Sequence, residues 1–115
     1  MASKGIQLYA EKKYELEELT ELIKPGMRKG LGAEFVDQVS YELGETKVVL
    51  MTFECLFIRI SSYASLSILL TEYGNCQGAY IVSSGGKEVL FSFGAEDRFV
   101  REGETVLKDL GFSGK

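Results

Sequence analysis

The residues best suited to binding chemistry form the short run Ser83-Ser84-Gly85-Gly86-Lys87. Glycines let successive backbone N–H groups converge on an anion, and a lysine adds positive charge. The run lacks the Walker spacing of a phosphate-binding loop, and the pattern after it predicts a strand where such a loop needs a helix. We therefore predict a hairpin loop whose glycines supply positive φ, with a weak anion site as the alternative.

Three further side chains have chemistry to offer, namely Glu54, Cys55 and Cys76. Glu54 interrupts the most apolar stretch of the chain, and a buried carboxylate there would need a partner. The alternative is a carboxylate at a wet interface. The two cysteines form no CxxC motif, and both lie in segments that are typical of strands. We expect them to be reduced, buried and unreactive.

Composition excludes several classes of function. The chain has no histidine, so Ser-His-Asp triads, Cys-His pairs and most zinc sites are excluded. We expect no catalytic residues, no metal and no cofactor. The net charge of -4 argues against a nucleic-acid partner. Charges interrupt every apolar run before it could span a membrane, and residues 1–10 lack the apolar core of a signal peptide. The expected location is the cytoplasm.

Hydrophobic periodicity indicates the elements that position these residues. Residues 5–10 are typical of a short strand, and the helical spacing after them predicts an amphipathic helix. Pro25 and Gly26 are expected to end that helix near Ile23 or Lys24. Strands are predicted over residues 33–43, 47–60, 63–73, 76–83 and 88–93. A terminal helix follows from Ala95, with Gly103 in the middle of its apolar stripe, where close approach to the sheet would explain the glycine.

These elements predict one α+β domain over residues 1–115, with the order β-α-β(4-5)-α. Consecutive strands joined by short turns pair antiparallel. Two amphipathic helices must bury their apolar stripes, and one face of the sheet is the surface available to both.

A resemblance agrees with this architecture. Residues 83–97 read SSGGKEVLFSFGAED, and Phe99 and a terminal helix follow. This pattern resembles a bacterial family of small uncharacterised α+β proteins, with a Ser-Gly-Gly hairpin before the last strand and the C-terminal helix. The resemblance implies a fold and no activity, so it assigns no functional residues. The strand order also resembles TATA-binding-protein-like and helix-grip layouts, which says nothing secure about function.

The predicted strand over residues 47–60 is apolar on both of its faces. A strand buried on one face only should alternate, and the even positions here are as apolar as the odd ones. We therefore expect the second face to be covered by a second copy of the protein, by a ligand on a concave sheet, or by the chain itself. The residues of this candidate ligand or dimer face are Val48, Leu50, Thr52, Glu54, Leu56 and Ile58.

The sequence thus favours a non-enzymatic interaction module that forms a homodimer through its sheet. The alternative is a small-molecule binding domain for an apolar, hydroxyl-bearing metabolite. Neither nucleic acid nor a membrane is expected as a partner.

Overall fold

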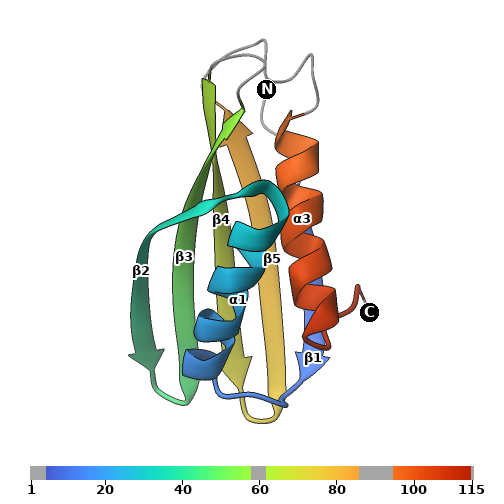
Figure 1. Ribbon diagram of the computed structural model, residues 1–115. Helices are drawn as coiled ribbons and strands as arrows, with labels where there is room; N and C mark the ends of the chain where they lie inside the picture. The colour runs from blue at the N-terminus through green and yellow to red at the C-terminus, as the bar shows by residue number, and fades with distance from the viewer. Residues whose placement is uncertain (1–4, 58–61, 86–94, 115) are drawn as a thin grey trace.

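The computed structural model describes residues 5–57, 62–85 and 95–114. Over these residues the protein is an antiparallel sheet with two helices on one of its faces (Figure 1). The elements in chain order are β1 (Ile6–Glu11), α1 (Leu16–Leu31), β2 (Glu34–Leu43), β3 (Thr46–Phe57), β4 (Ser62–Tyr73), β5 (Cys76–Gly85) and α3 (Ala95–Asp109). The predicted α+β class is confirmed, with four described strands, β2 to β5, between the two helices.

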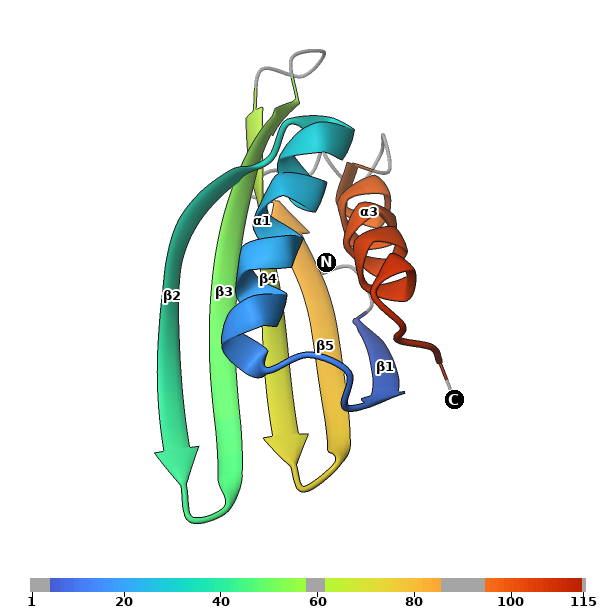
Figure 2. The same cartoon turned by 60° about the horizontal axis from the view of Figure 1, so that its bottom comes forward.

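Strands β2 to β5 form a meander, and β1 adds to its far side. Gly44 and Gly74 lie in the β2–β3 and β4–β5 turns with φ of 64° and 60°, a left-handed conformation that glycine adopts readily. The first strand pairs antiparallel with β5, so the order across the sheet is β1-β5-β4-β3-β2. Both helices lie on the same face, as the two views in Figures 1 and 2 agree.

Helix α1 passes through Pro25, so the prediction that it ends near Ile23 is wrong. Proline lacks an N–H and leaves one carbonyl of the preceding turn unbonded. Pro25 is on the exposed side of α1, where water can bond that carbonyl. Ile23 and Met27, on either side of the proline, are fully buried in the core. Burial of these side chains outweighs the lost hydrogen bond, and α1 continues to Leu31, where Gly32 caps it with a φ of 75°.

The core lies between the sheet and the two helices. Its largest fully buried side chains are Phe53, Phe99, Leu8, Leu16, Leu19, Ile23, Met27, Met51, Leu66, Ile68, Leu70 and Ile81. Gly103 brings α3 close to the sheet, as the sequence predicts. A Cβ at this glycine would lie 3.2 Å from Ile81 Cγ2 and 3.4 Å from Leu66 Cδ2.

The two edges of the sheet differ. At the β1 edge the C-terminal segment pairs with the strand, because Tyr9 N donates to Ser113 O at 2.7 Å and Ser113 N donates to Tyr9 O at 2.8 Å. Strand β2 forms the other edge, and no described element lies beyond it (Figures 1 and 2).

Some predictions concern residues outside the described part of the chain. They are the strand over residues 88–93, the Ile58 position of the candidate face, and Gly86 and Lys87 of the candidate anion loop. Within the described residues, neither helix has the length and apolar content needed to cross a membrane.

Candidate functional site

The sheet face that the helices leave uncovered is the candidate site, and we call it the open face. Strand register defines it, because side chains alternate between faces and cross-strand partners share one face. On β3 and β4 the register pairs Val48 with Thr71, Leu50 with Leu69, Thr52 with Ser67, Glu54 with Ser65 and Leu56 with Tyr63. The described residues of the predicted face therefore do share one face, and their partners on β4 lie on the same face.

One half of the open face is an apolar and aromatic surface. Residues that are cross-strand partners form rows that run across the sheet. The row that contains Val48 also contains Tyr41 on β2, Gly78 on β5 and Tyr9 on β1. The row that contains Leu50 likewise contains Val39, Tyr80 and Gln7. The side chain of Leu50 is 37% exposed and that of Tyr41 is 59% exposed. Exposed apolar side chains that gather on one surface often mark a site of interaction.

The other half of the open face carries hydroxyls and carboxylates. Thr52 lies between Asp37 and Ser67 in the register. In the next row Glu34 and Glu54 lie directly opposite each other, and like charges in that position destabilise a sheet. Every charged side chain that the described register places on the open face is acidic. Glu34, Asp37 and Glu54 lie in this half of the face, whereas Glu11 lies at the opposite end of the face, beside Cys76.

Two hollows interrupt the open face. The smaller has a volume of about 170 Å³ and lies over Gly78, which has no side chain, with Tyr9, Leu69, Thr71 and Tyr80 around it. The larger has a volume of about 650 Å³. It is lined by Glu34, Glu54, Leu56, Tyr63 and their neighbours at the start of β2.

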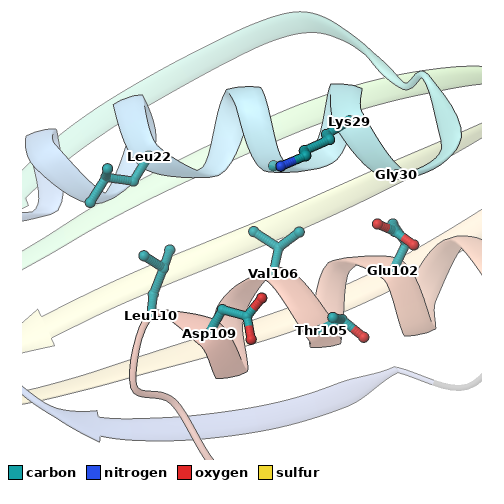
Figure 3. A pocket seen from close by; sticks show the side chains of 9 residues that line it. Leu22, Lys29, Gly30, Glu102, Thr105, Val106, Asp109 and Leu110 are labelled. Carbon is teal, nitrogen blue, oxygen red and sulfur yellow. The ribbon is translucent and has the colours of Figure 1, made fainter.

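A groove of about 360 Å³ runs between α1 and α3 on the helical side of the molecule (Figure 3). Leu22 and Val106 give it an apolar floor, and Lys29, Glu102 and Asp109 stand at its rim. The glycines of α1 let the helices approach each other here. A Cβ at Gly26 would meet Val106, and one at Gly30 would meet the Glu102 carboxylate. The groove is accordingly a feature of helix packing.

The two cysteines differ in environment. Cys55 is buried and donates from Sγ to the carbonyl of Leu31 at 3.4 Å. Burial raises the pKa of its thiol, although the positive charge of Arg98 acts in the opposite direction. Cys76 is exposed, so the prediction that it is buried is wrong. It is the first residue of β5, and its pairing with Tyr73 places it on the open face.

The remaining predicted site residues are placed as follows. Glu54 is exposed, so no buried partner is needed for its charge. Ser83, Ser84 and Gly85 belong to β5. The Ser83 hydroxyl donates to the carbonyl of Ser65 at 2.9 Å, and the hydroxyls of Ser65 and Ser84 lie 3.3 Å apart. Among the described residues, no three carboxylate or cysteine side chains gather closely enough to hold a metal ion.

Sequence reasoning missed the tyrosines of the open face, which are Tyr9, Tyr41, Tyr63, Tyr73 and Tyr80. A signal was present in β2, where Val39, Tyr41 and Leu43 alternate with polar residues. The alternation alone did not reveal that these side chains extend the β3 surface, because only the register of β2 with β3 places the two sets side by side.

Comparison with known proteins gives a family and no activity. No curated protein matches the chain. The profile of a family of unknown function, DUF6054, matches residues 1–111. This match covers nearly all of the sequence, including every described strand and both helices. The chain therefore belongs to the DUF6054 family of unknown function.

Proposed function

We propose that this protein is an interaction module without catalytic activity, and that its open face binds the open face of a second copy. The observation that carries the proposal is the apolar half of that face, in which Leu50, Tyr41 and Tyr80 are left to water in a single chain. Burying such side chains releases about 25 cal/mol for each Å² removed from water. Twofold packing requires only one self-complementary patch.

The charges of the open face favour one orientation of the two copies. A twofold axis along the strands would set the Glu34–Glu54 row of one copy against the same row of the other. The alternative is a twofold axis perpendicular to the strands, at a level between Val48 and Leu50. It places the apolar half of one copy against the apolar half of the other, with the strands of the two copies running in opposite directions. The acidic row of each copy then lies beyond the apolar rows of its partner, where water screens it.

The same orientation fills the smaller hollow. Gly78 and Tyr80 lie on one strand, two residues apart, on either side of the proposed axis level. The hollow over Gly78 in one copy therefore faces Tyr80 of the other, and the contact occurs twice by symmetry. Tyrosine is a common anchor of interfaces because its ring offers a large area at low entropic cost.

Matched substitutions test the proposal. Leu50→Lys places a charge in the centre of the apolar half, and Leu22→Lys places one on α1 at similar exposure, 41% against 37%. We expect a wild-type mass of at least 26 kDa by light scattering, which is twice the 12.8 kDa of the chain. Leu50→Lys should halve the wild-type mass while circular dichroism stays unchanged, and Leu22→Lys should preserve the mass.

Two results would overturn the proposal. One is a wild-type mass of 13 kDa up to about 1 mM, where even a contact worth about 4 kcal/mol would be half formed. The other is a Leu50→Lys variant that keeps the wild-type mass.

The larger hollow favours a second candidate function, the binding of an apolar, hydroxyl-bearing small molecule. Its volume of about 650 Å³ is within the range of roughly 300–1,000 Å³ that is typical of ligand sites. Glu34 and Glu54 offer acceptors to hydroxyl groups, and Leu56 and Tyr63 offer apolar contact. A panel of cyclic and branched diols should raise the melting temperature of the wild type but not of Glu54→Gln. An equal response in both proteins, or none in either, would exclude this site.

A further inference from the structure

A second surface, the free edge of β2, also has the properties of a self-association site. We propose that β2 pairs antiparallel with β2 of a second copy, centred on Ser40, so that two sheets join into one continuous sheet. This contact uses backbone groups at the sheet edge. It is therefore separate from the face-to-face contact proposed above and does not depend on it.

The asymmetry of the two edges is the first argument. Unpaired strand edges template pairing with other chains, and proteins normally shield them with short strands, lysine, proline, bulges or covering segments. The β1 edge is short and is covered by the Tyr9–Ser113 pairing. Strand β2 has ten residues, EFVDQVSYEL, with no lysine, arginine or proline among them. Its shielding devices lie toward its start, namely the irregularity at Val36, where the register shifts between Phe35 and Asp37, and the Asp37 carboxylate, which accepts the N–H of Gln38.

Backbone direction is the second argument. Gln38 N donates to the carboxylate of its neighbour Asp37 at 2.9 Å, so this N–H points away from β3. Backbone groups of alternate residues point to the same side of a strand. The N–H and C=O groups of Ser40 and Glu42 accordingly point outward as well. Two strands related by a twofold axis at Ser40 can then exchange both hydrogen bonds between the two Ser40 residues.

Self-complementarity is the third argument, and it selects the register. The regular part of β2 runs from Asp37, after the irregularity, to Leu43, before the turn, and its central residue is Ser40. Pairing about this centre sets Val39 against Tyr41 of the other copy on the open-face side. On the other side it sets Gln38 against Glu42. No like charges meet, and apolar cross-strand pairs of this type stabilise a sheet by a few tenths to about 1 kcal/mol each.

If the face-to-face contact of the proposed function also holds, the two contacts are compatible. Tyr41 pairs with Val48 and Val39 pairs with Leu50, so Ser40 lies at the level through which the face axis passes. Perpendicular twofold axes that meet at one point generate a closed assembly of four copies. This consequence rests on the proposed function, whereas the edge pairing does not.

Cysteine cross-linking tests the pairing and its register. In a Cys76→Ser background, Ser40→Cys should give a disulfide-linked dimer on mild oxidation, because the two Ser40 Cα atoms would lie within the roughly 4.4–6.8 Å that a disulfide spans. Gln38→Cys alone and Glu42→Cys alone should not cross-link, because their own copies would be about 13 Å apart. A mixture of those two proteins should cross-link. Glu45→Cys, in the exposed β2–β3 turn, gives the background level of cross-linking that random collision produces.

The outcomes decide the proposal independently of the open face. Cross-linking of Ser40→Cys above the Glu45→Cys level, with the same efficiency in a Leu50→Lys background, supports edge pairing even where the face contact fails. Cross-linking no better than that of Glu45→Cys, or equal cross-linking of Ser40→Cys and Gln38→Cys, overturns it. In solution, Ser40→Pro should halve the wild-type mass because it removes an outward N–H, and Ser40→Ala should preserve it.

Discussion

Lys12 Nζ lies 3.0 Å from Glu72 Oε2, and this ion pair joins the segment before α1 to the end of β4. Gln77 completes the contact, since its Nε2 donates to Glu72 Oε1 at 2.9 Å and to the carbonyl of Tyr14 at 2.8 Å. Burial of Glu72 disfavours its charged form, but hydrogen bonds from Gln77 and Lys12 and the charge of Lys47 outweigh this effect. The pKa of Glu72 accordingly lies below its usual value of 4.5.

This cluster predicts a specific dependence of stability on pH. A carboxylate with a lowered native pKa contributes stability above its unfolded pKa and loses it as pH falls through the native value. The wild type should therefore lose stability progressively as pH falls below about 4.5. Glu72→Gln removes the charge and should cost about 1–3 kcal/mol at pH 7, and its deficit should shrink in acid.

Urea unfolding at pH 7, 4.5 and 3 measures both effects, with Glu45→Gln in the exposed β2–β3 turn as the control. If the loss of unfolding free energy caused by Glu72→Gln stayed constant across this pH range, it would contradict the lowered pKa of Glu72.

The helical glycines predict opposite effects of the same substitution. Gly103→Ala gains about 1 kcal/mol of helix propensity, but its Cβ would press on Ile81 and Leu66 in the closely packed core. We expect net destabilisation, since overpacking costs about 1–3 kcal/mol. Gly30→Ala would displace only the end of the flexible Glu102 side chain, so it should raise the melting temperature. Calorimetry of the two variants checks the difference, and a stabilised Gly103→Ala would show that α3 has room to move.

The thiols should react at very different rates. Cys76 is exposed, whereas Cys55 is buried and its pKa is raised by burial. The thiolate is the reactive form, so both access and ionisation slow the reaction of Cys55. Ellman's reagent at pH 8 should label one thiol rapidly in the native wild type and none rapidly in Cys76→Ser. Unfolding in urea should expose the Cys55 thiol and make it react as well. Two rapidly reacting thiols in the native wild type would be inconsistent with a buried Cys55.

The C-terminal segment should stabilise the β1 edge through Phe112. This side chain is buried, and truncation of a buried phenylalanine to alanine costs about 3–5 kcal/mol. The neighbouring Ser113 pairs with Tyr9 through its backbone, so Phe112→Ala should also speed hydrogen exchange at the Tyr9 amide. Ser113→Ala keeps the backbone pairing and should leave that amide protected. If the Tyr9 amide exchanged as slowly in Phe112→Ala as in the wild type, the pairing of Ser113 with Tyr9 would not depend on the burial of Phe112.

The meander could be predicted because its signal is local. In residues 63–73 Ala64, Leu66, Ile68 and Leu70 occupy every second position, and all four are buried. Gly74-Asn75 marks the turn that follows. Burial on one face writes a two-residue period directly into the sequence, so no knowledge of the partner strands is needed.

The failures have a common cause, which is that tertiary contacts outweighed local preference. Pro25 is a strong local signal for the end of a helix, but the burial of Ile23 and Met27 continues α1 past it. Cys76 lies in a segment that is typical of a strand, but its pairing with Tyr73 turns it to the open face. The candidate site was predicted only in part, because a local pattern does not show which strands pair with each other. The two-sided apolar pattern of β3 identified the face, whereas its extent depends on the register with β2 and β5.

The pairing of β1 with β5 has a consequence for biosynthesis. Ile6 pairs with Ile81 and Glu11 pairs with Cys76, so the strand that leaves the ribosome early is joined to one that leaves it much later. Contacts between segments so distant in sequence form slowly because a long loop must close first. The nascent chain must therefore carry its first strand unpaired until β5 has been translated.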